Sequence, residues 1–421
     1  MKRSLLSIIA LMSIGTLSAQ AVVDTVTTGA NYATNVWYSL ANDEQGTAAS
    51  TEWDLGLAAT TSQSGVLTTS ILFNSKVGKV YEIPNSTPAN SFDTLETVDF
   101  TSLTPLVNND SSWAVGALNR TTPLGSFDYG WGSYDMSSHS ILANRVFVVK
   151  YTDNSTKKFY INLITVSGEY EIVSADLQNG ASETTQTLAI AAYSSKNYVY
   201  YKINTNTVID REPASANWDF TFQQYDAAIA PGMQYMSFGI LSNVGVEAVK
   251  VSGVSDVENF EDYSSQTFSD YTNAIGYNWK NAQMQTVPSD VVYFVKDKAG
   301  DIWKLVFTQF TTGSVMVDPN ASNKNVFSKE KISSLSVEDN AAKTFLSIYP
   351  NPSNGVANIV VDVASTAEVS IVDINGKEVF VSNTTAGLQV ISVNTSGLNS
   401  GVYLVNLTTN GVLTQQRLVV Q

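Results

Sequence analysis

The sequence has no cysteine in its 421 residues and a single histidine, His139. The first absence excludes disulfides, thiolate metal sites, cysteine nucleophiles and a lipid-modified N-terminal cysteine. The single histidine is the one base available for a Ser-His-Asp arrangement, and the sequence has neither a G-x-S-x-G elbow nor an H-E-x-x-H motif. A carboxylate pair for glycoside hydrolysis cannot be recognised from a motif, because its two residues are close in the folded structure and not along the chain. We therefore expect that the protein is not an enzyme.

Charged residues are also scarce, at 14%, and the formal net charge is −15. Nucleic-acid binding needs clustered Lys and Arg, so we expect no nucleic-acid partner. The long apolar run at 5–17 follows Met1-Lys2-Arg3 and precedes small residues. This pattern predicts a signal peptide over 1–21 and hence a secreted or cell-surface protein. No later run reaches the ~18 apolar residues of a spanning helix, so we expect no transmembrane span.

Aromatic residues are abundant, with Tyr 20, Phe 17 and Trp 7. They favour strands, and helix-favouring runs are scarce, so the predicted fold class is all-β. One pattern occurs twice. Trp53-Asp54 and Trp218-Asp219 each follow an aromatic strand and precede an apolar run that ends in Asn and Gly. We interpret both pairs as structural, with the indole between sheets and the carboxylate accepting hydrogen bonds from a neighbouring turn.

Each copy of this pattern is followed by a predicted β-hairpin. The hairpin of the first copy joins 146–151 to 158–163, and that of the second copy joins 291–296 to 302–307. An ordered series of matches indicates a duplication. We predict two related β-sheet modules in tandem, the first over residues 22–187 and the second over residues 188–320.

The end of the chain differs from both modules. After a predicted linker at 321–335, short strands follow at intervals of about ten residues, which predicts a β-sandwich of immunoglobulin-like type over 336–421. Its motifs closely resemble the type A C-terminal sorting domain of proteins exported by the type IX secretion system. The resemblance implies that machinery as partner, and delivery to the outer face of the outer membrane or to the medium. The residues that carry it include Pro350, Asn351, Pro352, Gly355, Gly376, Gly401, Tyr403 and Arg417.

The two modules resemble, more distantly, the HmuY family of bacterial haem-binding proteins. The likeness lies in the Trp-Asp pairs, the aromatic strands before them, and the closing hairpins that begin near Asn144 and Asp290. The resemblance implies an all-β fold in which protruding loops hold haem through two axial His or Met ligands. This chain departs from that pattern, because a single histidine cannot form a bis-histidine site.

Methionine is the remaining ligand type in the expected place. Met136 follows Trp131, and Met284 follows Trp279, at the same spacing and just before the closing hairpins. A thioether is a competent axial ligand for haem iron. Methionine beside aromatic residues also commonly fills gaps in a core, so packing is the alternative. The candidate haem ligands are Met136, Met284 and His139.

Two functions therefore stay open on the sequence alone. The first is an exported, non-enzymatic binding protein that captures haem or a related porphyrin. The second is a structural or adhesive surface protein that keeps the fold without a haem site and contacts surface polysaccharide or other cells. Both share one architecture, and the sequence leaves the ligand undecided.

Overall fold

The computed structural model describes residues 21–59, 69–230, 232–312, 322–333, 345–363, 365–373, 376–409 and 412–421. The chain divides into two compact units, Met1–Ser333 and Ser334–Gln421. The described residues form antiparallel sheets, with one four-residue α-helix, α1 (Pro88–Ser91), and four short 3₁₀ helices. This confirms the predicted all-β class. The predicted signal peptide lies outside the described residues except for its last position.

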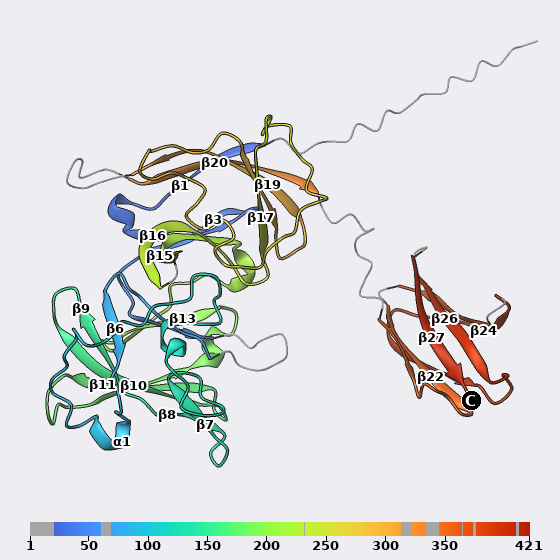
Figure 1. Ribbon diagram of the computed structural model, residues 1–421, viewed down its shortest axis with the longest axis horizontal. Helices are drawn as coiled ribbons and strands as arrows, with labels where there is room; N and C mark the ends of the chain where they lie inside the picture. The colour runs from blue at the N-terminus through green and yellow to red at the C-terminus, as the bar shows by residue number, and fades with distance from the viewer. Residues whose placement is uncertain are drawn as a thin grey trace, which may run out of the picture. The chain divides into compact units, whose positions relative to one another are not determined.

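The first unit consists of two lobes, each built from two packed sheets (Figure 1). We call one the outer lobe, because its strands come from both ends of the unit. Its five-stranded sheet has the order β1-β20-β19-β18-β17 and its four-stranded sheet the order β16-β15-β2-β3. The strands are β1 (Val22–Thr27), β2 (Thr34–Ser39), β3 (Asp43–Ala49), β15 (Phe220–Ala230), β16 (Met233–Ser242), β17 (Glu247–Ser252), β18 (Val291–Lys296), β19 (Ile302–Thr311) and β20 (Lys324–Ser333).

The inner lobe takes its strands from the middle of the unit. One sheet contains β12-β11-β10-β9-β6 and the hairpin β7–β8, and the other has the order β14-β13-β4-β5. The strands are β4 (Leu55–Ala58), β5 (Ile71–Phe73), β6 (Gly78–Glu82), β7 (Gly132–Asp135), β8 (Ser140–Ala143), β9 (Phe147–Tyr151), β10 (Thr156–Ile164), β11 (Glu169–Asp176), β12 (Thr184–Ala189), β13 (Tyr198–Lys202) and β14 (Thr207–Ile209). The 3₁₀ helices of the unit are η1 (Ala30–Tyr32), η2 (Ala117–Arg120), η3 (Ile190–Tyr193) and η4 (Ser215–Asn217).

The two lobes have matching sheet orders. The order β1-β20-β19-β18-β17 in the outer lobe corresponds to β12-β11-β10-β9-β6 in the inner lobe, and β3-β2-β15-β16 corresponds to β14-β13-β4-β5. In chain order, β1 to β11 therefore form one copy of the duplicated pattern and β12 to β20 form the other. Alike topologies support the duplication that the repeated Trp-Asp motif predicted.

The packed bodies differ from the predicted modules, because the copies exchange their first three strands. β2 of the first copy pairs with β15 of the second, and β13 of the second copy pairs with β4 of the first. The blue β1 accordingly lies beside the orange β20 in Figure 1. Residues 22–187 thus contribute to both lobes, as do 188–320. Residues 324–333, placed in a predicted linker, form β20 and close the outer lobe.

A buried carboxylate secures each exchanged strand. Asp54 Oδ2 accepts the Ile203 backbone N–H at 2.8 Å and the Tyr151 hydroxyl at 2.7 Å. Asp219 Oδ2 accepts the Leu40 backbone N–H at 2.7 Å. Leu40 and Ile203 are the first turn residues after β2 and β13, so each carboxylate accepts from a turn, as the sequence suggested, and that turn belongs to the other copy. The Trp-Asp pairs therefore have a specific structural role, which is to hold the strands that the two copies exchange.

Paired asparagines repeat the same local geometry in both copies. Asn74 Nδ2 donates to the carbonyls of Ser50 and Trp53, both at 2.9 Å. Asn243 Nδ2 donates to the carbonyls of Ser215 and Trp218, at 2.9 and 2.7 Å. An unpaired buried backbone carbonyl is costly, so these amides hold the loop before each Trp-Asp pair in place.

The closing hairpins are confirmed in both lobes. β9 pairs antiparallel with β10, and β18 with β19. The connecting turns contain left-handed residues, Asn154 at φ 68° and Gly300 at φ 87°, as tight hairpin turns require. Lys158 on β10 and Lys304 on β19 occupy matching, buried positions, and each Nζ donates to loop carbonyls, including Leu95 O at 3.0 Å for Lys158 and Glu258 O for Lys304.

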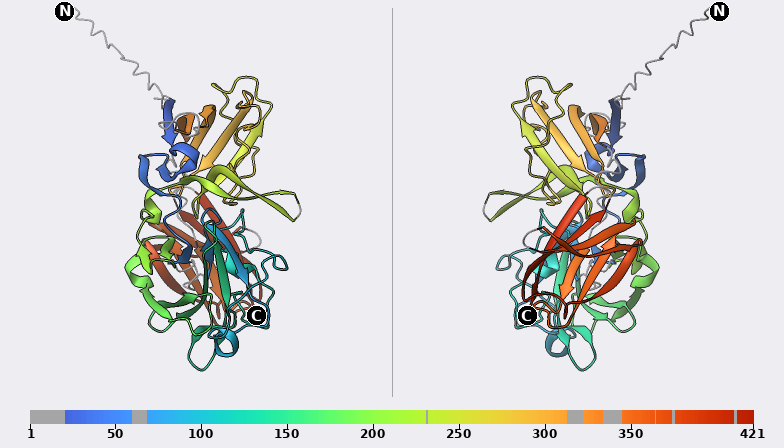
Figure 2. Two further views of the ribbon diagram at one scale, coloured as in Figure 1. Left: turned by 90° about the vertical axis from the view of Figure 1, so that its left-hand side faces the viewer. Right: turned by 90° about the vertical axis from the view of Figure 1, so that its right-hand side faces the viewer.

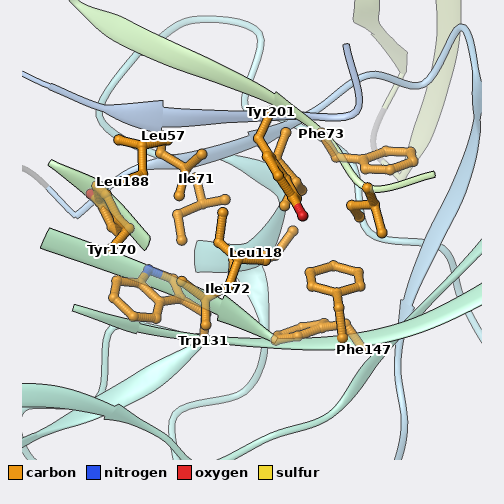
Figure 3. Close-up of a cluster of buried hydrophobic side chains, with 14 of the residues drawn as sticks. Leu57, Ile71, Phe73, Leu118, Trp131, Phe147, Tyr170, Ile172, Leu188 and Tyr201 are labelled. Atoms are coloured by element: carbon orange, nitrogen blue, oxygen red, sulfur yellow. The ribbon is translucent and has the colours of Figure 1, made fainter. Parts of the chain in front are cut away.

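Each lobe has its own apolar core between its sheets. In the inner lobe, Trp131, Tyr170 and Leu118 point into the same space from different elements (Figure 3). In the outer lobe, Trp279 packs against Phe307 with ring centroids 4.6 Å apart. Fully burying such a side chain contributes roughly 1.5–3 kcal/mol, so these aromatics account for much of the lobes' stability without any disulfide.

The second unit is a β-sandwich, as predicted. One sheet has the order β21-β22-β25 and the other the order β24-β23-β26-β27, with an apolar core between them. Strands such as β26 alternate buried and exposed side chains, which is the pattern of sheets packed on one face. The strands are β21 (Phe345–Tyr349), β22 (Val356–Val363), β23 (Ala367–Val372), β24 (Glu378–Thr384), β25 (Gly387–Asn394), β26 (Gly401–Thr409) and β27 (Val412–Val420).

The exchange contacts should carry measurable stability. We predict that Asp54→Ala lowers the free energy of unfolding of the first unit by about 2–4 kcal/mol, because two buried donors lose their acceptor. Asp219→Ala should cost less, since one backbone donor is lost. Urea denaturation of the mature chain measures both. The exposed Asp270→Ala serves as control, and equal stability of all three variants would contradict the assigned role.

Candidate functional site: a cleft between the two lobes

A cleft opens where the two lobes of the first unit meet. Outer-lobe strands β2 and β15 and inner-lobe strands β5 and β13 all contribute to its walls. Because the exchange puts strands of each copy into each lobe, both copies line it. The lining residues are Asn35, Trp37, Ser50, Trp53, Leu72, Phe73, Asn74, Ser75, Lys76, Asn108, Asn109, Asp110, Trp113, Asn197, Tyr198, Tyr200, Glu212, Trp218, Thr221, Gln223, Gln224, Tyr225, Asp226, Met236, Leu241 and Thr272.

One side of the cleft is an aromatic cluster organised by Arg211. The Arg211 guanidinium lies 5.1 Å from the ring centroids of Trp37 and Tyr200 and 5.6 Å from that of Trp53. Glu52 holds the same guanidinium through a 2.8 Å ion pair. Stacked cation–π contacts of this kind fix the orientation of the rings. The aromatic faces are therefore preorganised before any ligand arrives.

A half-buried tryptophan extends this cluster along the cleft. Trp113 Nε1 donates to Ser242 O at 2.7 Å, across the junction of the lobes. Its ring lies 6.1 Å from that of Tyr198, whose hydroxyl donates to Trp113 O. The indole nitrogen is thus satisfied by the protein, while the ring remains partly exposed.

β15 and β16, which continue the sheet of β2, form a further part of the cleft wall. These strands extend together as a two-stranded ribbon beyond the part of β15 that pairs with β2 (Figure 2). At the base of the ribbon, Gln224, Asp226 and Met236 line the cleft. Asp226 accepts the Ser75 hydroxyl at 2.5 Å, which ties the ribbon to the inner-lobe loop after β5.

Unpaired buried polar atoms gather around this cleft. Trp53 Nε1, Trp218 Nε1, Ser50 Oγ and Thr221 Oγ1 are all buried and have no hydrogen-bond partner among the described residues. All four residues line the cleft. Each such group costs roughly 1–3 kcal/mol, and native structures contain few of them. Their concentration at one place, with the two equivalent indoles among them, makes this cleft the candidate functional site.

Burial perturbs the acids of the cleft. It raises the pKa of Glu212 to about 7, against the opposing hydrogen bonds that Glu212 accepts from Tyr200 and the Asn197 amide. Burial likewise raises the pKa of Asp226, opposed by its bond from Ser75. A raised pKa means that the interior favours the protonated, uncharged acid.

The cleft is small. Its cavity volume is about 70 Å³, which corresponds to roughly five to seven water positions at ~10–15 Å³ each. Those waters would occupy about 150–200 Å³ of liquid, below the ~300–1,000 Å³ typical of pockets for drug-sized ligands. The enclosed space therefore suits one small ring or one residue of a longer molecule.

The predicted haem ligands lie elsewhere. Met136 is on the turn between β7 and β8 and is 74% exposed, while Met284 is on a turn closed by the Asn281–Thr286 bridge and is 72% exposed. The buried Trp131 and Trp279 precede these turns, so the two positions are structurally equivalent. Neither methionine fills a gap in a core, and neither lines the cleft.

His139 lies on the same turn as Met136. Its Nδ1 is 2.8 Å from the Tyr134 hydroxyl, which orients the ring. Met136 and His139 belong to one four-residue turn in the inner lobe, whereas Met284 belongs to the outer lobe. These exposed turns offer a contact on one side of a haem and not an enclosed site with two axial ligands. Haem ligation by these residues stays a prediction.

The sorting-signal residues cluster at one end of the second unit. Asn351 Nδ2 donates to Arg417 O at 2.6 Å and its Oδ1 accepts the Val419 amide at 2.9 Å. The flanking Pro350 and Pro352 both follow cis peptide bonds. Gly355 and Gly376 adopt left-handed φ values of 98° and 79°, Gly401 begins β26, and the Tyr403 hydroxyl donates to Asn399 O at 2.9 Å. The motif thus forms the turns and final strand of the sandwich.

Comparison with known proteins identifies the second unit. Residues 347–421 match the family model of the secretion system C-terminal sorting domain. The chain is therefore a cargo of the type IX secretion system and is delivered to the cell surface or the medium. A search of curated proteins finds no match. Nothing in these comparisons supports the HmuY resemblance of the first unit, which stays a prediction.

Two further observations concern the described residues. None of their helices is long and apolar enough to cross a membrane. No three or more of their acidic or histidine side chains lie together in a group that could hold a metal ion.

The sequence does not predict the cleft, although it does draw attention to Trp53 and Trp218. Its walls come together through the exchange, and no spacing along the chain marks it.

Glu212 should make the stability of the first unit depend on pH. The pKa of Glu212 is about 7 in the folded protein, compared with an ordinary value of 4.5 for a glutamate side chain. The folded state thus binds the extra proton between these values, and stability is lost as pH rises through that window. Relative to Glu212→Gln, the wild type should lose roughly 3 kcal/mol from pH 4.5 to 7 and then level off. Denaturation curves across pH measure this. A constant difference between the two proteins would refute the prediction.

Proposed function

We propose that this protein is an exported, non-enzymatic binding protein whose binding site is the cleft between the two lobes. The observation that carries the proposal is the gathering of preorganised aromatic faces and unpaired buried polar atoms at this one cleft. Clefts that combine apolar walls with a few convergent polar groups are the usual form of small-ligand sites. Type IX secretion places such a site outside the cell.

Binding is favoured over catalysis by how the acids of the cleft are engaged. Asp110 Oδ2 accepts the Ala228 amide at 2.9 Å and the Asn273 side-chain amide at 3.1 Å. Asp226 and Glu212 are also held by neighbouring groups. A general acid or nucleophile must be directed at substrate, whereas these carboxylates fix the walls of the cleft.

Haem capture at the exposed turns is the second candidate. Its supporting observation is the Tyr134–His139 contact, because a metal-binding imidazole is commonly oriented through its other ring nitrogen. Exposed apolar side chains on the adjoining loop, Leu124 and Phe127, would contact a porphyrin face. A structural or adhesive role without any small ligand is the third reading, and the two experiments below distinguish them.

Filling the cleft should abolish ligand binding. Gln224→Trp introduces a large ring into the cleft wall, while Gln234→Trp makes the same change on the neighbouring strand outside the lining. We expect some members of a panel of sugars, amino acids and nucleosides to raise the Tm of wild type and Gln234→Trp, but not of Gln224→Trp. If no compound stabilises the wild type in this cleft-dependent way, the proposed site is wrong.

Titration with haemin tests the second candidate. If the turns hold haem, a Soret shift should appear and should weaken by at least about tenfold in the Met136→Ala/His139→Ala double variant, since both candidate ligands of that turn are lost. Met284→Ala tests the outer-lobe turn in the same way. A spectrum that does not change on adding the protein, or that these variants leave unchanged, removes haem ligation at the turns.

A further inference from the structure

We infer that the ligand of the cleft is an uncharged carbohydrate, of which one pyranose ring enters the cavity. The inference rests on the proposed binding function and specifies its chemical class. It follows from four properties of the cleft: its size, its aromatic faces, its amide groups and its charge.

Size limits what can enter. The cavity volume of about 70 Å³ corresponds to liquid volume of roughly 150–200 Å³, which is room for a single six-membered sugar ring. A tetrapyrrole is several times larger than this volume. The cleft is partly open to solvent, so further residues of a saccharide chain could continue out of it.

The aromatic faces match the apolar faces of a sugar. A pyranose presents C–H groups on its two faces, and their slight positive charge is attracted by the negative face of an aromatic ring. Trp113 is half-buried, with its indole nitrogen already donating to Ser242 O. The protein therefore fixes the ring at the wall of the cleft, and the indole N–H is not available to a ligand, so the ring would contact a sugar through its apolar surface.

The polar groups match hydroxyls in particular. Asn109, Gln223 and Gln224 line the cleft with side-chain amides. The oxygens of Asn109 and Gln223 accept from Ser111 and Asn35, which leaves their N–H groups as donors, while Gln224 carries both a donor and an acceptor. A hydroxyl also donates and accepts at the same time, so one sugar hydroxyl can bond two such groups. Trp53 Nε1 and Thr221 Oγ1 also belong to lining residues; both atoms are buried and unpaired, and they would gain partners if the walls shift on binding.

Charge selects against anionic sugars. Asp110 and Asp226 line the cleft, and the whole protein carries a net charge of −15. Lys76 also lines the cleft, but its Nζ donates to the backbone carbonyls of Asn31 and Tyr32, and burial lowers its pKa to about 8. This lysine is engaged by the protein itself, and burial favours the uncharged form of Asp226. A carboxylate or sulfate on the ligand would therefore find no free cation among the described lining residues, and would meet Asp110 and the net negative charge of the protein.

Calorimetric titration tests the inference. The ligands are neutral methyl glycosides and oligosaccharides of glucose, galactose, mannose and xylose, with glucuronic acid as the charged comparison. We expect at least one neutral sugar to bind and glucuronic acid to bind at least about tenfold more weakly. Trp113→Ala should weaken the neutral sugar at least tenfold, and Trp113→Phe, which keeps an aromatic face and guards against a folding defect, should recover most of it. Tyr235→Ala, an exposed ribbon residue outside the lining, should bind as wild type.

Other outcomes would overturn the inference. Failure of every neutral sugar to bind, equal affinity for glucuronic acid, or full affinity in Trp113→Ala would each contradict it. If amino acids or nucleosides instead stabilise the wild type but not Gln224→Trp, the cleft is a binding site of another chemistry. In that case the proposed function stands and the carbohydrate inference fails.

Discussion

The structure of the first unit depends on two buried carboxylates that each grip a strand from the other copy. Asp54 holds the backbone at Ile203, and Asp219 holds the backbone at Leu40. Burial raises the pKa of both acids, so these contacts are made at some cost. That cost is offset because an aromatic strand, buried on both faces, is secured in each lobe. Neither lobe is complete without strands from both copies.

The cleft is a consequence of this exchange. Connections cross between the lobes at 50–54 and 210–219, and the loops before Trp53 and Trp218 lie at the crossing. The aromatic cluster around Arg211 joins rings from both copies, with Trp37 from the first and Tyr200 from the second. Unpaired polar atoms collect at the same place. Unpaired buried polar atoms destabilise the protein locally, and such unfavourable features in an otherwise stable fold are typical of functional sites.

Much of the fold follows from local pattern. Alternating apolar residues and turn residues at Asn154 and Gly300 predicted the hairpins, and the motif at 349–355 predicted the sorting sandwich, which the family match confirms. The pairing of β2 and β13 did not follow, because both strands carry the same aromatic pattern and either Trp-Asp strand could accept either partner. The cleft could not be predicted for the same reason. The exposed positions of Met136 and Met284 are likewise set by turn geometry and not by composition.

Disulfide trapping tests the exchange most directly, since the chain has no cysteine of its own. Val36 on β2 lies opposite Phe222 on β15. The variant Val36→Cys/Phe222→Cys should form an intramolecular disulfide under mild oxidation and keep the native fold. Val36→Cys/Leu57→Cys, which pairs the same strand with the Trp-Asp strand of its own copy, should keep free thiols. The reverse result would show that each copy folds on itself, and would contradict both the exchange and the cleft built on it.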